Sequence, residues 1–98
     1  MSRFVLTPAA REDLLEIVDY IREDSPEAAQ RVLRKLQDSM RRLARSPGMG
    51  HLREDLADEP LRFWPVYSYL IIYRLETRPL QIVRVLRGTR DVKSLLTP

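Results

Sequence analysis

Residues 61–87, LRFWPVYSYLIIYRLETRPLQIVRVLR, decide the fold, because apolar and polar side chains alternate along much of this stretch. A period of two indicates β-strands, and we predict three of them at residues 61–64, 66–75 and 80–87. Residues 76–79, Glu-Thr-Arg-Pro, supply a turn between the last two. The sequence therefore predicts a three-stranded antiparallel meander.

The last predicted strand carries two arginines whose faces can be assigned from the alternation. Successive side chains of a strand point to opposite sides of the sheet. One face is expected to hold Leu80, Ile82, Arg84 and Leu86, and the other Gln81, Val83, Val85 and Arg87. Arg84 and Arg87 are thus predicted on opposite sides of the sheet, with one of them nearer the helices.

Two amphipathic helices are predicted before the meander. Thr7-Pro8 and Ser25-Pro26 each combine an N-cap residue with proline at the first helical position. Apolar side chains then recur at helical spacing from residue 8 to about residue 24, and again from residue 26 until Ser46-Pro47-Gly48. Because only a tight junction separates the helices, we expect an antiparallel hairpin that packs on the sheet.

The remaining segments complete an α+β fold. Residues 3–7 read as a short strand, residues 47–60 as a loop, and the residues after Gly88 as a short tail. The expected order is β-α-α-β-β-β: a short N-terminal strand, then an antiparallel helix hairpin packed on an antiparallel sheet, with a short C-terminal tail.

The size and composition are those of one globular domain, which we expect to span residues 1–98. Apolar residues make up 44% and charged residues 32%, so a packed core is feasible. The longest apolar run, residues 70–73, is far shorter than the roughly 20 residues of a membrane helix. Cysteine is absent, which suits a reducing compartment. We expect a cytoplasmic protein that does not associate with membranes.

Positive charge is concentrated in the C-terminal part of the chain. The formal net charge is +3, yet residues 61–98 alone hold seven basic and two acidic side chains. Nearly all the basic residues there are arginines, whose planar guanidinium binds phosphate or carboxylate at two points. This pattern indicates an acidic or phosphate-bearing partner, and a solubilising surface is the alternative.

Candidate catalytic residues are few. His51 is the only histidine, so a histidine metal cluster is not available and no metal site is expected. His51 is interpreted as a turn or surface residue, with a general base or phosphate contact as the alternative. Tyr67, Tyr69 and Tyr73 are expected on one face of the central strand, in the core or else stacking on bases. Trp64 marks the end of an edge strand or anchors a partner chain.

Residues 82–91, IVRVLRGTRD, resemble the terminal signature of the ParE/RelE superfamily of bacterial toxins. Further similarities run through almost the whole chain. They are Pro8-Ala9-Ala10, Asp13-Leu14, Ile17, Tyr20-Ile21, Pro26, Ala28-Ala29, Pro47-Gly48-Met49-Gly50, Leu61-Arg62 and the segment from Tyr69 to Tyr73-Arg74. Any one of these is weak, but together they are specific. The resemblance implies the toxin of a toxin–antitoxin pair.

The resemblance is compatible with two activities, and an inactive relative is a third alternative. RelE-like members cleave messenger RNA on the ribosome, for which Arg62, Arg84 and Arg87 with His51 or a tyrosine are the candidates here. Many such nucleases have histidine where this chain has Arg87, and they often carry late aromatic or histidine residues that the tail 95–98 lacks. The pattern is therefore closer to ParE. A relative that only binds its antitoxin is the third alternative.

A ParE-like toxin is expected to inhibit DNA gyrase by binding, with no catalytic residue and no cofactor. From local charge we predict a target-binding surface of Arg84, Arg87, Arg90 and Lys93. Arg84 is alternatively a structural residue paired with Glu76 or Asp91.

The implied partner is a ParD-like antitoxin in a hetero-oligomer, which is expected on the outside of the helix hairpin and on the sheet edge. Trp64, Tyr20 and Arg74 are its predicted contacts. DNA is expected to be reached only through the antitoxin or the gyrase complex.

Overall fold

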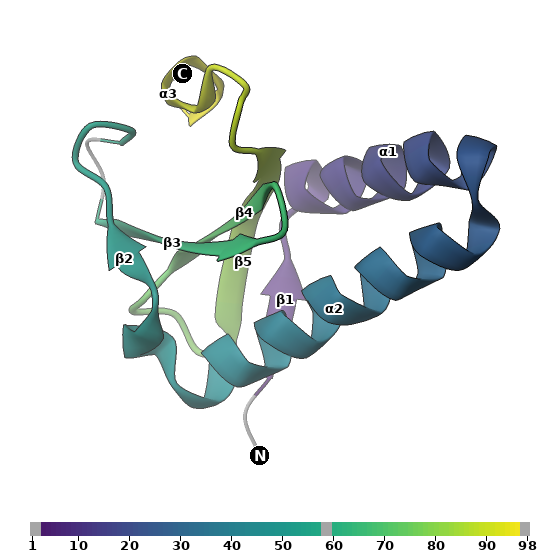
Figure 1. Ribbon diagram of the computed structural model, residues 1–98. Coiled ribbons are helices and arrows are strands. Elements are labelled where there is room, and N and C mark those ends of the chain that lie inside the picture. The colour runs from purple at the N-terminus through teal and green to yellow at the C-terminus, as the bar shows by residue number, and fades with distance from the viewer. Residues whose placement is uncertain (1–2, 58–59, 97–98) are drawn as a thin grey trace.

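The computed structural model describes residues 3–57 and 60–96 and confirms the predicted α+β class. Within these residues, nine elements follow one another (Figure 1). They are β1 (Phe4–Leu6), α1 (Pro8–Asp24), α2 (Pro26–Arg45), the single-turn 3-10 helix η1 (Pro47–Met49), β2 (His51–Leu52), β3 (Leu61–Val66), β4 (Tyr69–Arg74), β5 (Leu80–Arg87) and α3 (Val92–Leu96).

Both predicted helix starts are confirmed by their caps. The hydroxyl oxygen of Thr7 accepts a hydrogen bond from the backbone N–H of Ala10 at 3.1 Å, and that of Ser25 accepts one from Ala28 at 3.1 Å. Each cap satisfies an N–H that the first helical turn leaves without a partner. Ser25 also ends α1, because its backbone N–H donates to the carbonyl of Ile21. One residue thus separates the two helices, and they pair as the expected hairpin.

The sheet is mixed and has the strand order β1-β5-β4-β3-β2. The predicted meander of β3, β4 and β5 is antiparallel, but β1 lies parallel to β5. The chain between β1 and β5, which runs from α1 to β4, is the long connection that a parallel pair requires. The predicted loop 47–60 also contains strand β2, which is only two residues long and pairs with β3. Such a short strand produces too little alternation to be recognised from sequence.

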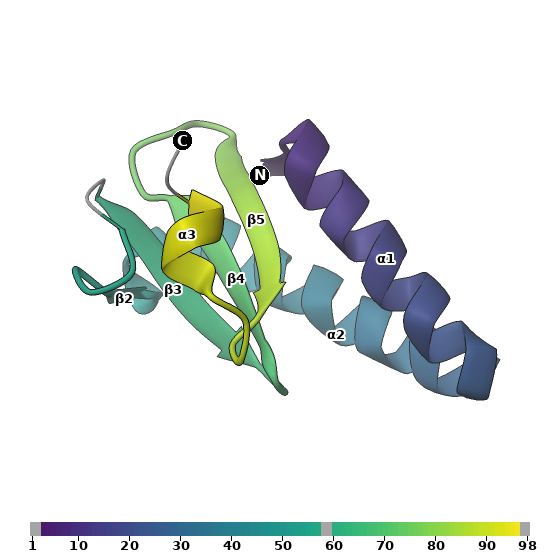
Figure 2. The same cartoon turned by 90° about the horizontal axis from the view of Figure 1, so that it is seen from above.

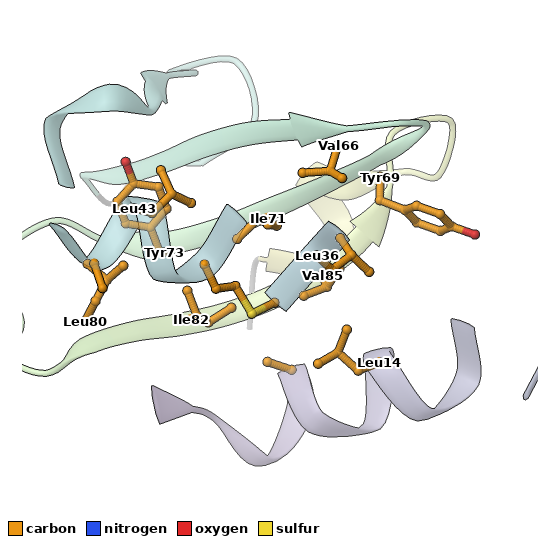
Figure 3. Packing of buried hydrophobic residues seen from close by; sticks show 13 residues of the cluster. Leu14, Leu36, Leu43, Val66, Tyr69, Ile71, Tyr73, Leu80, Ile82 and Val85 are labelled. Carbon is orange, nitrogen blue, oxygen red and sulfur yellow. The ribbon is translucent and has the colours of Figure 1, made fainter. Parts of the chain in front are cut away.

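Helices α1 and α2 cover one face of the sheet, and α3 lies on the other (Figures 1 and 2). The larger cluster of buried side chains lies between the hairpin and the sheet (Figure 3). It includes Leu14, Leu36, Met40, Leu43, Val66, Ile71, Tyr73 and Ile82. Leu61, Phe63, Ile72 and Leu86 form a smaller cluster with Val92 of α3. The residues after Gly88 thus include a docked helix. No helix of the described residues is both long and apolar enough to cross a membrane.

A β-bulge changes the predicted faces of β5. Ile72 pairs with Arg84 while Tyr73 pairs with Ile82, so that Val83 has no partner on β4. The extra residue reverses the alternation. Val85 therefore joins Leu80 and Ile82 on the helix side, and Leu86 faces α3. The prediction that Leu80, Ile82, Arg84 and Leu86 share one face is wrong for this reason.

The turn between β3 and β4 also differs from the prediction. The central strand begins at Tyr69 rather than at residue 66, because Tyr67 and Ser68 form a two-residue turn. Tyr67 has a φ of 55° and a largely exposed side chain, whereas Tyr69 and Tyr73 are buried in the core. The three tyrosines thus do not share one face. A left-handed backbone costs a residue other than glycine about 1–2 kcal/mol.

Tyr73 fastens the segment before β2 to the sheet. Its hydroxyl accepts a hydrogen bond from the backbone N–H of Gly50 at 2.9 Å and donates one to the carbonyl of Pro47. Burial raises the pKa of this phenol above its ordinary value. The approach is close, since a Cβ on Gly50 would lie 2.3 Å from the Tyr73 oxygen. Packing therefore requires glycine at position 50, whereas a Cβ at Gly48 would meet open space.

We expect Gly50→Ala to lower the free energy of unfolding by about 1–3 kcal/mol, because the new methyl group must displace a fully buried phenol. Gly48→Ala is the matched control, since nothing lies within 4 Å of a Cβ at that position. Urea denaturation of both variants measures the difference. Equal stabilities for the two variants would contradict this account of Tyr73.

Candidate functional site

Helix α1 completes the edge of β5 that β1 leaves open. Strand β1 pairs only with Leu80 to Ile82. Beyond that point the Thr7 hydroxyl donates to the carbonyl of Val83 at 2.7 Å, and a carboxylate oxygen of Asp13 accepts from the N–H of Val85 at 2.9 Å. Polar backbone groups of the second half of β5 are thus satisfied by side chains from the start of α1.

The same carboxylate holds Arg84 in a two-point ion pair. Arg84 Nε and Nη2 donate to the two oxygens of Asp13 at 2.8 and 2.9 Å. The side chains of Asp13 and Arg84 are only 7% and 21% exposed. The hydrogen bond that Arg84 donates to Asp13 raises the pKa of Arg84. Pairing with Glu76 or Asp91 is therefore a wrong prediction, since the partner lies 71 residues earlier in the chain.

A cavity of about 270 Å³ lies between α1 and the C-terminal end of β5. It is lined by Asp13, Glu16, Ile17, Tyr20, Tyr69, Val85, Arg87, Thr89 and Arg90. The guanidinium carbon of Arg87 lies 5.7 Å from the centre of the Tyr20 ring, in a cation–π contact. Tyr20 is 63% exposed. An aromatic ring and two arginines thus line one accessible surface.

Two predicted target-binding residues and one predicted antitoxin contact meet at this cavity. Arg87 and Arg90 line it together with Tyr20. Arg84 is occupied by Asp13, and Lys93 lies on α3, where it acts electrostatically on Asp55 of the segment after β2. Both Arg84 and Arg87 contact α1, through Asp13 and through Tyr20.

Acidic side chains of α1 partly neutralise the basic end of β5. Glu12, Asp13 and Glu16 all act electrostatically on Arg84. Two of them, Asp13 and Glu16, also line the cavity that holds Arg87 and Arg90. The charge surplus of residues 61–98, counted along the chain, is therefore reduced in space by carboxylates from the N-terminal half.

The four side chains proposed for RNA cleavage are spread over the sheet. Arg62 on β3 donates from Nη1 to the carbonyl of Gly50 at 3.1 Å, on the far side of β4 from Arg84. Its Nε is buried and has no hydrogen-bond partner within the described residues. Two strand spacings of about 4.8 Å separate β3 from β5. His51 lies one strand farther, on β2.

The remaining residues predicted as catalytic or antitoxin contacts lie in different places in the fold. The rings of His51 and Trp64 stack with centroids 6.0 Å apart and an interplanar angle of 10°. Trp64 is partly buried against the main core, and Arg74 lies at the end of β4. His51 and Trp64 thus contact each other, whereas Arg74 and Tyr20 lie on other elements, β4 and α1. Over residues 3–57 and 60–96, no group of three His, Cys, Asp or Glu side chains is arranged to hold a metal ion.

Comparison with known proteins identifies the family. The model of the ParE toxin of the type II toxin–antitoxin system parDE matches residues 4–92. The chain belongs to the ParE toxin family. A solved structure described as a chromosomal ParDE toxin–antitoxin system from P. aeruginosa is similar to this ParE-family chain, with a TM-score of 0.70 and 23% identity. The similarity covers 89% of this chain and 96% of that one. A search of curated proteins finds no significant match.

Asp13 and the cavity were not anticipated as a site. The sequence points to Asp13 only as part of the resemblance to the family. An acidic residue on the polar side of a helix ordinarily faces solvent, and only its burial reveals a partner. Similarity to the family is the better signal of a role for Asp13, because Asp13 and Arg84 each belong to a segment that resembles the family.

Asp13→Asn is expected to lower the free energy of unfolding by about 2–4 kcal/mol, because it leaves the partly buried Arg84 without a counter-charge. Asp19→Asn on the same helix is the control, since its 3.8 Å pair with Arg22 is exposed and should contribute under about 1 kcal/mol. Chemical denaturation measures both. In Asp13→Asn combined with Arg84→Met, the loss should be smaller than the sum of the two single losses.

The ion pair between Asp13 and Arg84 would be contradicted if the losses in free energy of unfolding were additive in that double variant. It would also be contradicted if Asp13→Asn were as stable as Asp19→Asn.

Proposed function

We propose that this ParE-family toxin inhibits DNA gyrase by binding it, and that a ParD-like antitoxin neutralises the toxin in a hetero-oligomer. Family membership supports the toxin role, and the name of the similar solved structure, a ParDE system, supports the antitoxin partner. A gyrase target implies action in the cytoplasm. The proposal requires a binding surface and no catalytic group.

The observation that carries the proposal is the separation of the candidate nuclease residues. Phosphoryl transfer requires cationic groups and an acid or base around one phosphate. Here His51 and Arg62 lie on the β2–β3 side of the sheet, while Arg87 lies at the end of β5. Arg84 is already paired with Asp13. This arrangement favours binding over RNA cleavage.

The surface that fits a protein target best is the cavity of Tyr20, Arg87 and Arg90. Tyrosine and arginine dominate the binding energy of many protein interfaces. The ring of Tyr20 is exposed, and Arg87 lies over it. An antitoxin segment that contacts Tyr20 would therefore also cover Arg87. Neutralisation is explained if the antitoxin and the target compete for this one surface.

Arg87→Ala combined with Arg90→Ala is expected to raise the toxin concentration for half-inhibition of gyrase supercoiling at least about tenfold, since interface arginines often contribute more than 1 kcal/mol. Arg31→Ala, an exposed position on α2, should leave inhibition unchanged. Relaxed plasmid and purified gyrase provide the assay, and thermal unfolding verifies that each variant is folded.

Messenger integrity in a translation extract tests the alternatives. Intact messenger together with lost supercoiling supports the proposal. Rapid messenger cleavage by the wild-type chain would favour a RelE-like nuclease, and no effect in either assay would favour an inactive relative. A double variant that inhibits gyrase as well as the wild type would remove Arg87 and Arg90 from the target surface.

A further inference from the structure

A second cavity, of about 450 Å³, lies at the other end of β5 and is lined by three arginines. Its lining residues are Arg3, Ala44, Arg45, Pro47, Arg78, Pro79 and Leu80. None of these arginines was assigned a role from the sequence. They come from three segments that are distant along the chain and meet at the lower end of the molecule in Figure 1.

A backbone hydrogen bond joins two of the three segments. Arg3 precedes β1, and its carbonyl accepts a hydrogen bond from the N–H of Leu80 at 3.0 Å. Arg45 is the last residue of α2. Arg78 lies in the β4–β5 turn, where the Thr77 hydroxyl accepts from the N–H of Gln81 at 2.8 Å. The arginines therefore project from positions that the fold determines.

Among the described residues, the charged side chains that line the cavity are all cationic. No acidic residue is among its lining residues. Within residues 3–57 and 60–96, Arg3, Arg45 and Arg78 form no ion pair. The cavity near Arg87 differs, because Asp13 and Glu16 line it. Positive charges that share one concave surface repel each other and produce a high local positive potential. A bound anion would lower this potential and reduce the repulsion.

The lining favours phosphate over a protein partner. Arginine forks match phosphate oxygens at two points. The apolar lining residues are Ala44, Pro47, Pro79 and Leu80, of which Ala44 and Leu80 are buried, so an acidic protein segment would find no large exposed apolar side chain to pack against. No aromatic ring lines it either, whereas proteins that bind single strands stack bases on such rings.

We propose that Arg3, Arg45 and Arg78 form a site for the phosphate backbone of double-stranded DNA. This proposal does not depend on gyrase being the target. It goes beyond the expectation from sequence that DNA is reached only through the antitoxin or the gyrase complex, because the toxin itself would contact the backbone. Such binding would be independent of base sequence and would weaken as salt displaces it.

Fluorescence anisotropy of a labelled DNA duplex with the purified full-length chain tests the site in the absence of gyrase and antitoxin. The double variant Arg45→Ala/Arg78→Ala should weaken binding at least about tenfold at low salt, and reduce the slope of log K against log salt by about one to two. The matched control Arg31→Ala/Arg34→Ala removes the same charge from exposed positions of α2 and should cost clearly less.

Lysine replacements test the two-point geometry. Arg45→Lys/Arg78→Lys keeps the charge, and we expect affinity between those of the wild type and the alanine variant. Thermal unfolding verifies that the variants fold. Equal losses for the two alanine double variants, or no duplex binding by the wild type, would overturn the proposal. Tighter binding to single-stranded RNA, or displacement of DNA by polyglutamate at equal charge, would also overturn it.

Discussion

A buried carboxylate on α1 determines how the helix hairpin sits on the sheet. Asp13 accepts hydrogen bonds from two nitrogens of Arg84 and from the backbone of Val85. It occupies the edge of β5 that the three-residue β1 does not reach. Because α1 is held against this edge, Tyr20, two turns farther along the helix, lies beside Arg87. The cavity proposed as the target surface therefore depends on the Asp13–Arg84 pair.

The same contact explains why charge counted along the chain describes the surface poorly. The C-terminal part has a basic surplus, but acidic residues of α1 lie against it. The concave surface without acidic lining residues is elsewhere, at Arg3, Arg45 and Arg78, and two of these arginines belong to the N-terminal half. Electrostatic potential depends on distances in space, which the fold determines and a count along the sequence ignores.

The positions of the candidate catalytic residues on the sheet help to distinguish a toxin that binds its target from one that cleaves RNA. Strands β3 and β2 keep Arg62 and His51 away from Arg87. Arg62 and His51 have structural contacts instead, with the Gly50 carbonyl and with the Trp64 ring. This arrangement is the basis of the proposal that the ParE-family chain acts by binding its target rather than by cleaving RNA.

The sequence by itself determined the elements with strong local signals. Thr7-Pro8 and Ser25-Pro26 predicted the helix starts, since a cap involves only neighbouring residues. Alternation predicted the meander, and the family pattern predicted the toxin. Tertiary structure alone decided the parallel pairing of β1, the bulge at Val83, the partner of Arg84 and the meeting of Arg3, Arg45 and Arg78. Each of these joins residues far apart in the chain, and such contacts form only when the whole core packs.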